Sequence, residues 1–515
     1  MPRPERRLLE LLDEAASTAR LLTDPRPEPA GVGYLDDPDG DLARAIDTVA
    51  RHEGPITVFA GAGVSMEAGL PSWRDLVGRL LEDLGADLPD EDRAIWVDEI
   101  LREGPLAAAA TARALHSDDA GFRRALRRAL YGDRPAGAFA PETLARALAR
   151  LKAGLGDRVA LLTANYDGLL EAALADAGLH PASPVSGRAE AAGRAAVWHL
   201  HGRLIPGVEP GPLVLTEGDY VRSTTEEWPQ DFVAERLETS LCLFVGLSLT
   251  DPNFIRWLYR HGPAGTHPHM AVFVRQGGRA MSPAVRARLE DAASARWSQS
   301  GITPVWTNFY GEVAQLVHEI ALRCADPATP PFRTRAARHL AAGRDLVVPR
   351  SAERFRAAQH DLSDWLVALV GDVRHVAAAA GVSLPARTLG LGLWGADHAA
   401  GVAELWATSE RALLGPEGLE SRAMHPATDW VGVETILRGT PVEQDLYWSP
   451  SRWRFVRGIP LMAEEAGRRT PAGAMTLTCV LPPDECPLSE GRAPDRLLPE
   501  IDRLLAESAA GIFSP

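Results

Sequence analysis

The stretch "ITVFAGAGVSMEAGLPSW", residues 56–73, leads from a short apolar run through a glycine-rich turn into the start of a helical pattern. The apolar run has the length of a buried strand. Gly61, Ala62 and Gly63 follow it directly, and small residues at this point let backbone amides approach a phosphate at the start of the next helix. The stretch therefore predicts a strand, a turn and a helix that either bind a nucleotide or only redirect the chain.

This glycine loop departs from the common dinucleotide fingerprint G-x-G-x-x-G. Met66 stands at the third glycine position. The fingerprint also needs an acidic residue at the end of a second strand about 20 residues further on, but Glu82 and Asp83 fall in a helical pattern. The sequence therefore disfavours an ordinary dehydrogenase.

Four more apolar runs of strand length alternate with helical patterns, at residues 159–166, 196–202, 241–248 and 270–276. Continuous apolar runs in this alternation indicate a parallel sheet covered by helices on both faces. We expect an α/β fold with a Rossmann-like parallel sheet, closed by a helix at 309–324. An alanine- and leucine-rich helical insert is expected at about residues 76–152.

A chain of 515 residues is too long for one ordinary core. We expect a helical or flexible amino-terminal segment at 1–40 and the sheet domain at 41–325. A proline- and arginine-rich linker at 326–350 then precedes a smaller α+β domain at 351–515, which opens with a helix and changes to short strands.

Composition and charge disfavour several classes of protein. The net charge of −15 argues against a nucleic-acid groove, which needs clustered cations. No apolar run reaches the roughly 20 residues of a membrane span, and the amino terminus has no secretory apolar region. The cysteines form no close CxxC pair, which disfavours a zinc site and fits a reducing compartment. They are Cys242, Cys324, Cys479 and Cys486. We expect a cytoplasmic protein without a metal.

Polar residues and glycines gather where three of the predicted strands end. They are Thr163, Asn165 and Asp167 after the second run, His201 and Gly202 after the third, and Gly246, Ser248, Asp251 and Asn253 after the fourth. Ligands of open parallel sheets bind beyond the carboxyl ends of the strands. The three sets, together with the glycine loop, therefore predict a single crevice.

Plainer roles exist for several of these side chains. Asn165 and Asp167 could cap the helix that begins at Gly168. Asp251 and Asn253 most simply form a turn that caps the helix after them.

His199 and His201 lie two apart on a predicted strand and would share a face, which is also a metal-ligand spacing. No other ligand set is apparent, so His199 is expected to pack behind the site. Ser65 has no neighbouring base in the sequence. Its hydroxyl is therefore expected near a phosphate rather than as a nucleophile.

The order of the motifs GAGVS, GLPSW, TANYD, LHG and GLSLTDPN resembles the sirtuin superfamily, specifically the bacterial SIR2-like branch found in antiphage defence proteins. The resemblance spans roughly residues 40–325 and implies NAD as the substrate. It also implies roles for the residues at the matching positions. Gly61, Ala62, Gly63 and Ser65 would line the NAD phosphates and ribose, Asn165, Asp167 and His201 would surround the nicotinamide ribose, and Gly246 and Ser248 would hold the adenosine side. Trp73, Arg74 and Thr163 complete the expected cofactor-binding set.

Two departures separate this chain from the protein-deacylating sirtuins that it resembles. Those enzymes have a GIPDFR-like stretch where this chain has "GLPSWR", so that Ser72 and Trp73 replace an aspartate and a phenylalanine. They also carry two zinc-binding cysteine pairs after the catalytic histidine, and this chain has no cysteine between His201 and Cys242. The resemblance therefore favours NAD hydrolysis, the activity associated with the defence branch, over deacylation.

Cleavage of nicotinamide from NAD passes through an oxocarbenium-like ribose. His201 is the candidate base, because an imidazole titrates near pH 6.5. Asn165 would orient the water or the ribose. Asp167 would stabilise the positive transition state or position the carboxamide. The open alternatives are an NAD-dependent protein deacylase in the same crevice and a non-catalytic module that senses NAD or ADP-ribose.

The carboxyl-terminal part resembles the late part of GAF-type sensor domains, in a strand with Ile-Pro-Leu, a hairpin, a returning strand and a last helix; an unrelated α+β domain is the alternative. Its tryptophans fill a core or line a ligand pocket. They are Trp394, Trp406, Trp430, Trp448 and Trp453. We expect a regulatory domain that receives a small-molecule or protein trigger, and a homo-oligomer.

Overall fold

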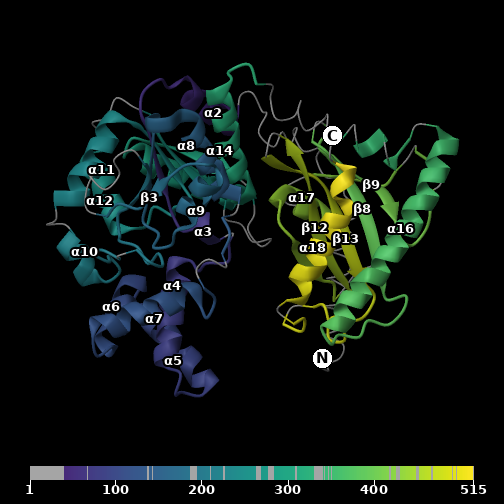
Figure 1. Cartoon of the computed structure of the whole chain (residues 1–515), viewed down its shortest axis with the longest axis horizontal. Helices are drawn as coiled ribbons and strands as arrows, with labels where there is room; N and C mark the ends of the chain where they lie inside the picture. The colour runs from purple at the N-terminus through teal and green to yellow at the C-terminus, as the bar shows by residue number, and fades with distance from the viewer. Residues whose placement is uncertain are drawn as a thin grey trace, which may run out of the picture.

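The computed structural model describes Gly40 to Phe513 with short internal gaps. The gaps are residues 67, 136–138, 142, 186–193, 209, 224–226, 262–267, 276–282, 308–309, 330–339, 341–342, 346, 350, 399, 414, 417–418, 425–427, 429, 448–451, 466–467, 490 and 495. Most of the predicted amino-terminal segment, much of the linker and Trp448 therefore lie outside the described residues. Figure 1 shows one sheet in the first part of the chain and another in the last part.

The first sheet has seven strands in the order β3-β4-β2-β1-β5-β6-β7, and every pair of neighbours is parallel. Its strands are β1 (Ile56–Ala60), β2 (Val159–Thr163), β3 (Pro181–Ala182), β4 (Ala195–His199), β5 (Leu241–Val245), β6 (His269–Val274) and β7 (Ile302–Thr307). The expected α/β class and the parallel sheet are confirmed. All five predicted runs are strands, and β3 and β7 extend the sheet at its two edges.

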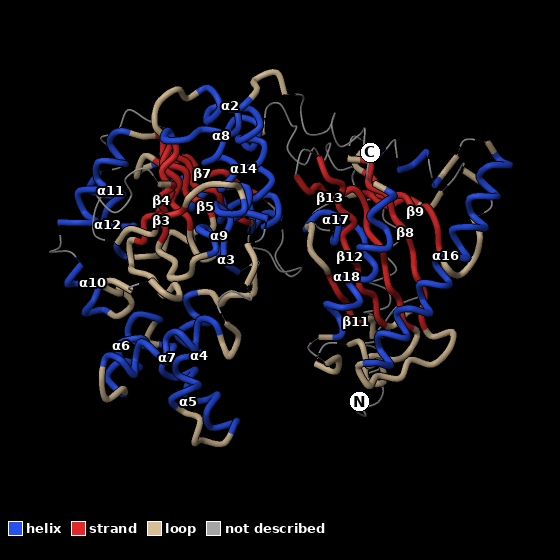
Figure 2. The backbone as a smooth tube through the Cα atoms, viewed as in Figure 1, coloured by secondary structure: helices blue, strands red, loops and turns tan. Residues whose placement is uncertain are grey.

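Helices cover both faces of this sheet (Figure 2), and its central strand β1 is therefore buried throughout. Ile56, Val58 and Ala60 pack on one face with α2 (Asp41–Arg51), α8 (Thr143–Leu155), α9 (Leu169–Asp176) and α14 (Tyr310–Ala325). Phe59 points to the other face and stacks on Phe244 with ring centroids 4.8 Å apart. That face is covered by α11 (Glu227–Thr239), α12 (Pro252–His261) and α13 (Pro283–Ser298).

Four helices between β1 and β2 form a separate bundle, here called the helical arm: α4 (Trp73–Leu84), α5 (Asp90–Arg102), α6 (Pro105–Leu115) and α7 (Asp119–Tyr131). The arm extends beyond one edge of the sheet unit in Figure 1. Helix α8, which the sequence groups with the insert, packs on the sheet instead. Its buried Leu148 and Leu151 belong to the same core as Ile56 and Val58.

The second sheet is antiparallel, with six strands in the order β10-β9-β8-β13-β12-β11. Its elements are α16 (Ala352–Ala379), β8 (Leu389–Asp397), β9 (Val402–Thr408), β10 (Ser421–Ala423), α17 (Val431–Arg438), β11 (Val442–Asp445), β12 (Phe455–Glu465), β13 (Arg468–Cys479) and α18 (Leu497–Ala509). Helices α16 and α18 pack on one face and α17 on the other. Trp406 and Trp394 are buried in these two cores and fill space, as the plainer expectation held, whereas Trp430 is 38% exposed. The likeness to GAF domains and the domain boundaries stay predictions.

Within the described ranges, the structure contains no helix with the length and hydropathy that crossing a bilayer requires.

Candidate functional site

The carboxyl ends of the central strands of the first sheet lie side by side, because β1 is in register with both of its neighbours. Ala60 pairs with Thr163 of β2 on one side and with Val245 of β5 on the other. The loops that follow these strands therefore leave the sheet together. They open into a cavity of about 1150 Å³ that the helical arm and α10 (Glu217–Ser223) also line.

Eleven of the twelve residues predicted for the site line this cavity. They are Gly61, Ala62, Gly63, Ser65, Trp73, Arg74, Asn165, Asp167, His201, Gly246 and Ser248. Thr163 is buried instead. Its hydroxyl donates to the Ala60 carbonyl (2.9 Å) and accepts the N–H of Asn165 (3.0 Å). Thr163 therefore fixes the turn that presents Asn165.

The glycine loop packs directly on the loop after β5. A Cβ at Gly61 would lie 2.5 Å from the Gly246 carbonyl oxygen, and one at Gly63 would lie 2.7 Å from the Gly246 Cα. The N–H groups of Gly61 and Gly63 donate to Val245 and Gly246, and the helix that follows, α3 (Gly63–Met66), has a single turn. The glycines are therefore required by packing, and these two amides are engaged within the protein rather than directed at a phosphate.

Asn165, Ser65 and Asp167 form a hydrogen-bonded group beside this loop. The Asn165 amide donates to the Gly61 carbonyl and to the Ser65 hydroxyl, both at 3.0 Å. Ser65 donates in turn to Asp167 Oδ2 (2.8 Å), whose other oxygen accepts the N–H of Leu169 (3.1 Å). Burial raises the pKa of Asp167, and the hydrogen bond from Ser65 opposes that rise. Asp167 thus accepts the first N–H of α9 and orients the Ser65 hydroxyl, so the simpler expectation of a helix cap holds for Asp167, whereas the Asn165 side chain bonds to the glycine loop instead.

A buried ion pair lies behind Asn165. His199 Nε2 is 2.7 Å from Glu171 Oε1, and His199 Nδ1 is 2.8 Å from the Asn165 carbonyl oxygen. A carbonyl oxygen only accepts and a carboxylate oxygen also accepts, so this geometry fits a protonated imidazole that donates from both ring nitrogens. Burial alone would lower the pKa of His199, but the Glu171 carboxylate and these hydrogen bonds raise it. His199 therefore lies behind the site, as expected, and ties Asn165 to α9.

The two histidines do not share a strand face, which corrects the expectation from their spacing. Strand β4 ends at His199. Leu200 N–H still bonds to the Thr163 carbonyl of β2 at 2.8 Å, and the chain then turns, with the Gly202 N–H donating to the His199 carbonyl at 3.5 Å. Gly202 then adopts φ +80°, where its missing side chain also avoids a clash with the Pro212 carbonyl oxygen at 2.2 Å. The turn sends His201 into the cavity while His199 stays beneath it.

His201 lies among side chains from α10 and the start of α12. Its Nδ1 is 3.7 Å from Asp251 Oδ2, and its Nε2 is 3.5 Å from the Asn253 amide nitrogen. Burial lowers the pKa of His201 and the Asp251 carboxylate opposes this, so the imidazole is neutral near neutral pH. Asp251 also caps α12, because its Oδ1 accepts the N–H groups of Asn253 and Phe254.

Sequence reasoning missed Tyr220 and Glu171. Tyr220 lines the cavity from α10, and its hydroxyl donates to Asp251 Oδ2. The available signal was the pattern T-E-G-D at 216–219, a helix start of capping-box type in which Asp219 accepts the N–H of Thr216 at 2.9 Å. That pattern locates the helix, but it does not say that Tyr220 meets His201.

Ser248, Trp73 and Arg74 lie farther along the cavity wall. The Ser248 hydroxyl is 2.7 Å from that of Thr250 in the loop after β5. Trp73 and Arg74 begin α4 after the Ser72 cap, and the Arg74 guanidinium donates to the Leu101 carbonyl at 3.5 Å. The arm therefore contributes the wall opposite the strand ends.

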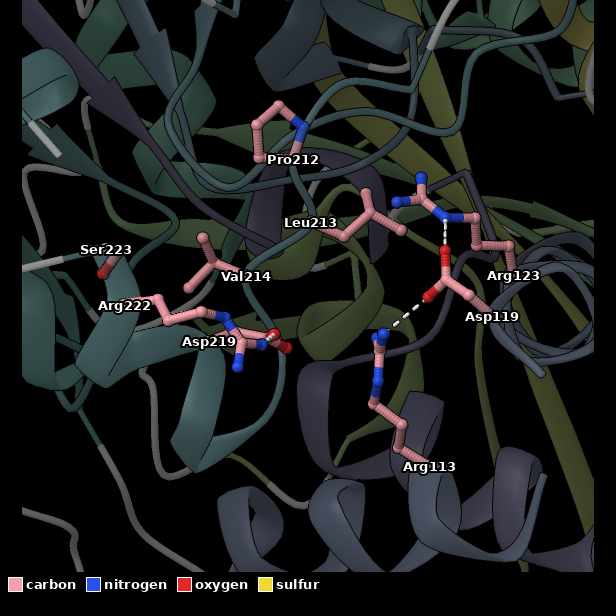
Figure 3. Close-up of a pocket in the computed structure, with 9 residues that line it drawn as sticks. All are labelled: Arg113, Asp119, Arg123, Pro212, Leu213, Val214, Asp219, Arg222 and Ser223. Carbon is pink, nitrogen blue, oxygen red and sulfur yellow. Dashed lines mark hydrogen bonds and ion pairs between the residues drawn. The ribbon is translucent and has the colours of Figure 1, made fainter. Parts of the chain in front are cut away.

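A second, smaller pocket of about 230 Å³ lies between the arm and α10 (Figure 3). On the arm, Asp119 is paired with Arg113 at 2.5 Å and with Arg123 at 2.7 Å. On the facing side, Arg222 is paired with Asp219. Helix α10 therefore has one face in this pocket and carries Tyr220 into the larger cavity.

The described part of the chain contains no group of three or more histidine, cysteine, aspartate or glutamate side chains placed to hold a metal ion.

Comparisons with known proteins agree with this geometry. Residues 159–305 match the model of the SIR2-like domain. The chain is 36% identical over 147 residues to an NAD-dependent protein deacetylase of Haloarcula marismortui, a match that covers 28% of this chain and 46% of the relative. It is 25% identical over 235 residues to the NAD(+) hydrolase ThsA of Enterococcus faecium, covering 43% of this chain and 44% of the relative. The chain thus spans less than half the length of either relative.

Among solved structures, a SIR2 homologue in complex with NAD is similar over 56% of this chain and 95% of its own, at 14% identity and a TM-score of 0.30.

Proposed function

We propose that this protein is an NAD glycohydrolase that cleaves NAD to nicotinamide and ADP-ribose. The observation that carries the proposal is the cavity that Asn165, Ser65, Asp167 and His201 line together at the ends of three parallel strands. The match of residues 159–305 to the SIR2-like domain and the similarity to an NAD(+) hydrolase support it.

The cavity has room for an extended dinucleotide, because its volume of about 1150 Å³ exceeds the roughly 300–1,000 Å³ of common small-molecule sites. Asn165 and Ser65 would contact the nicotinamide ribose near the glycine loop. Gly246 and Ser248 would hold the adenosine side in the loop after β5. Two loop amides already bond within the protein, so contacts to the diphosphate would come from other groups of the cavity wall.

The reaction needs a water molecule at the anomeric carbon as the bond to nicotinamide breaks. His201 is neutral near neutral pH because it is buried, so its imidazole can accept a proton from that water. Asn165 would orient the ribose hydroxyls through its amide, which two hydrogen bonds already hold in one direction. Asp167 would place negative charge below the developing oxocarbenium ion through the Ser65 hydroxyl.

A protein deacylase is the second candidate, favoured by the similarity to an NAD-dependent protein deacetylase. The sequence argues against it. The cysteine pairs expected for the zinc module beside a peptide cleft are missing between His201 and Cys242, and Ser72 and Trp73 replace residues of the deacylase motif. A non-catalytic module that senses NAD or ADP-ribose is the third candidate.

The resemblance to the antiphage branch extends the proposal to a regulated effector in bacterial defence. Uncontrolled NAD loss would harm the cell that makes such an enzyme. We therefore propose that the carboxyl-terminal domain holds the activity at a low but measurable level until a small molecule or a protein triggers it, and that the fully active form is a homo-oligomer.

Product analysis separates the three candidates. The purified protein is incubated with NAD over a series of protein concentrations, with and without an acetyl-lysine peptide, and nicotinamide, ADP-ribose, cyclic ADP-ribose and O-acetyl-ADP-ribose are separated by chromatography. Nicotinamide release without the peptide supports the hydrolase. Acetyl-ADP-ribose that forms only with the peptide would establish the deacylase. Binding of NAD without any turnover, at every concentration, would favour the sensor.

A further inference from the structure

The surroundings of His201 contain a feature that base catalysis alone does not require. Tyr220 lies edge-on to the imidazole, with ring centroids 5.5 Å apart and an interplanar angle of 73°. Its hydroxyl donates to Asp251 Oδ2, the same oxygen that faces His201 Nδ1 at 3.7 Å. One carboxylate oxygen therefore faces both the tyrosine and the histidine.

Hydrogen bonds to the other carboxylate oxygen of Asp251 also hold this side chain in place. Oδ1 accepts two backbone N–H groups at the start of α12, from Asn253 at 2.8 Å and from Phe254 at 3.2 Å. The carboxylate cannot rotate without losing these bonds or the bond from Tyr220. It thus presents an acceptor to the Nδ1 side of His201 in a single direction.

The opposite side of the imidazole meets a donor. The Asn253 amide nitrogen lies 3.5 Å from His201 Nε2 and donates to the Ser223 hydroxyl at 3.3 Å. An acceptor beside Nδ1 and a donor beside Nε2 select one neutral tautomer, with the proton on Nδ1 and the lone pair on Nε2. His201, Asn253 and Ser223 are all buried, which strengthens this preference because polar interactions are stronger in surroundings of low dielectric.

We propose that Tyr220 and Asp251 are positioning residues that hold His201 in the Nδ1–H tautomer, so that Nε2 stays a base. Tyr220 acts through Asp251, and Asp251 acts directly on the ring. The catalytic consequence rests on the proposed hydrolase function, but the tautomer of His201 does not.

The test uses the full-length protein with ¹⁵N-labelled histidine, in which imidazole NMR reports the tautomer of each ring. The His201→Gln variant identifies the His201 signals. The proposal predicts the Nδ1–H tautomer in the unaltered protein, a mixture of tautomers in Tyr220→Phe, and a larger fraction of Nε2–H in Asp251→Asn, since the new amide can donate to Nδ1. Tyr259→Phe is the matched control, because Tyr259 is 54% exposed on α12.

Kinetics with NAD provide the second measurement. A positioned base contributes roughly 10²–10⁴-fold to a rate. We expect Tyr220→Phe to lower kcat by about 10-fold and Asp251→Asn by about 100-fold, with KM within about twofold and Tyr259→Phe unchanged.

Two results would overturn the proposal. One is a His201 that carries its proton on Nε2 in the unaltered protein. The other is a tautomer and a kcat that both stay the same in Tyr220→Phe. If the unaltered protein does not turn over NAD, the proposed hydrolase function fails and the NMR result still decides the role of Tyr220 and Asp251.

Discussion

Replacing Gly61 by alanine tests whether the glycine loop is shaped by packing. The added Cβ would lie 2.5 Å from the Gly246 carbonyl oxygen and 2.5 Å from the Leu247 Cδ2 atom, well inside ordinary contact at 3.4 Å. The leucine side chain can turn away, but the carbonyl belongs to the backbone that also accepts the N–H of Gly63. The loops after β1 and β5 must therefore separate.

The size of the effect follows from two opposing contributions. Overpacking of a close contact costs about 1–3 kcal/mol. Loss of backbone freedom in the unfolded chain returns about 0.4–1 kcal/mol when alanine replaces glycine. We expect a net loss of about 1–2 kcal/mol in the free energy of unfolding. For a domain as large as the one that holds the parallel sheet, this loss lowers the melting temperature by roughly 2–5 °C.

The assay is thermal unfolding of the variant by calorimetry, with Gly154→Ala as the matched control. Gly154 lies in the last turn of α8, and a Cβ there meets nothing within 4 Å. The control should gain up to about 0.5 kcal/mol, since alanine is the better helix former. Gly61→Ala should also lose NAD turnover, because Asn165 bonds to the Gly61 carbonyl. If Gly61→Ala melts at or above the temperature of Gly154→Ala, the packing argument is wrong.

Two further predictions address stability. Glu171→Gln should destabilise the protein by about 1–3 kcal/mol. The carboxylate of Glu171 raises the pKa of His199, so the ion pair stabilises the fold fully below about pH 6.5 and this stabilisation is lost as the pH rises through the folded-state pKa. The difference in free energy of unfolding between parent and variant, measured in urea, should therefore become smaller toward alkaline pH. A difference that does not depend on pH would contradict the ion pair. Arg457→Met should lower the stability of the carboxyl-terminal domain by about 1–2 kcal/mol. The Arg457 side chain is largely buried, and its guanidinium joins β12 to Asp502 of α18 (2.8 and 2.6 Å) and to Glu443 of β11. Arg503→Met, at an exposed pair on the same helix α18, should change it by less than about 0.5 kcal/mol in the same denaturation experiment, and equal losses would argue against the buried network.

Much of the first fold could be predicted from the sequence, because its strands are short apolar runs between helical patterns. A parallel sheet follows from that alternation, and parallel strands end at one edge, so the loops at Gly61, Asn165, His201 and Gly246 come together. The packing of α8 could not be predicted. Its apolar face has the same periodicity as the helices of the arm, and periodicity does not say which surface covers a face.

The finer geometry of the site depends on contacts between residues distant in the chain. His201 leaves the strand that carries His199 because Gly202 has a positive φ and packs closely against the Pro212 carbonyl. No local pattern encodes that turn. Tyr220 and Glu171 were missed for the same reason. Tyr220 bonds to Asp251, 31 residues away in the chain, and Glu171 bonds to His199, 28 residues away.

NAD consumption by the purified protein, compared with three variants, decides whether the cavity residues catalyse the reaction; the variants are His201→Ala, Asn165→Ala and His360→Ala. His360 is the matched control, because its side chain is 79% exposed on α16. The parent and His360→Ala should release nicotinamide without any acylated peptide, and His201→Ala and Asn165→Ala should not, while both site variants remain folded by circular dichroism. Full activity in both site variants would contradict this prediction.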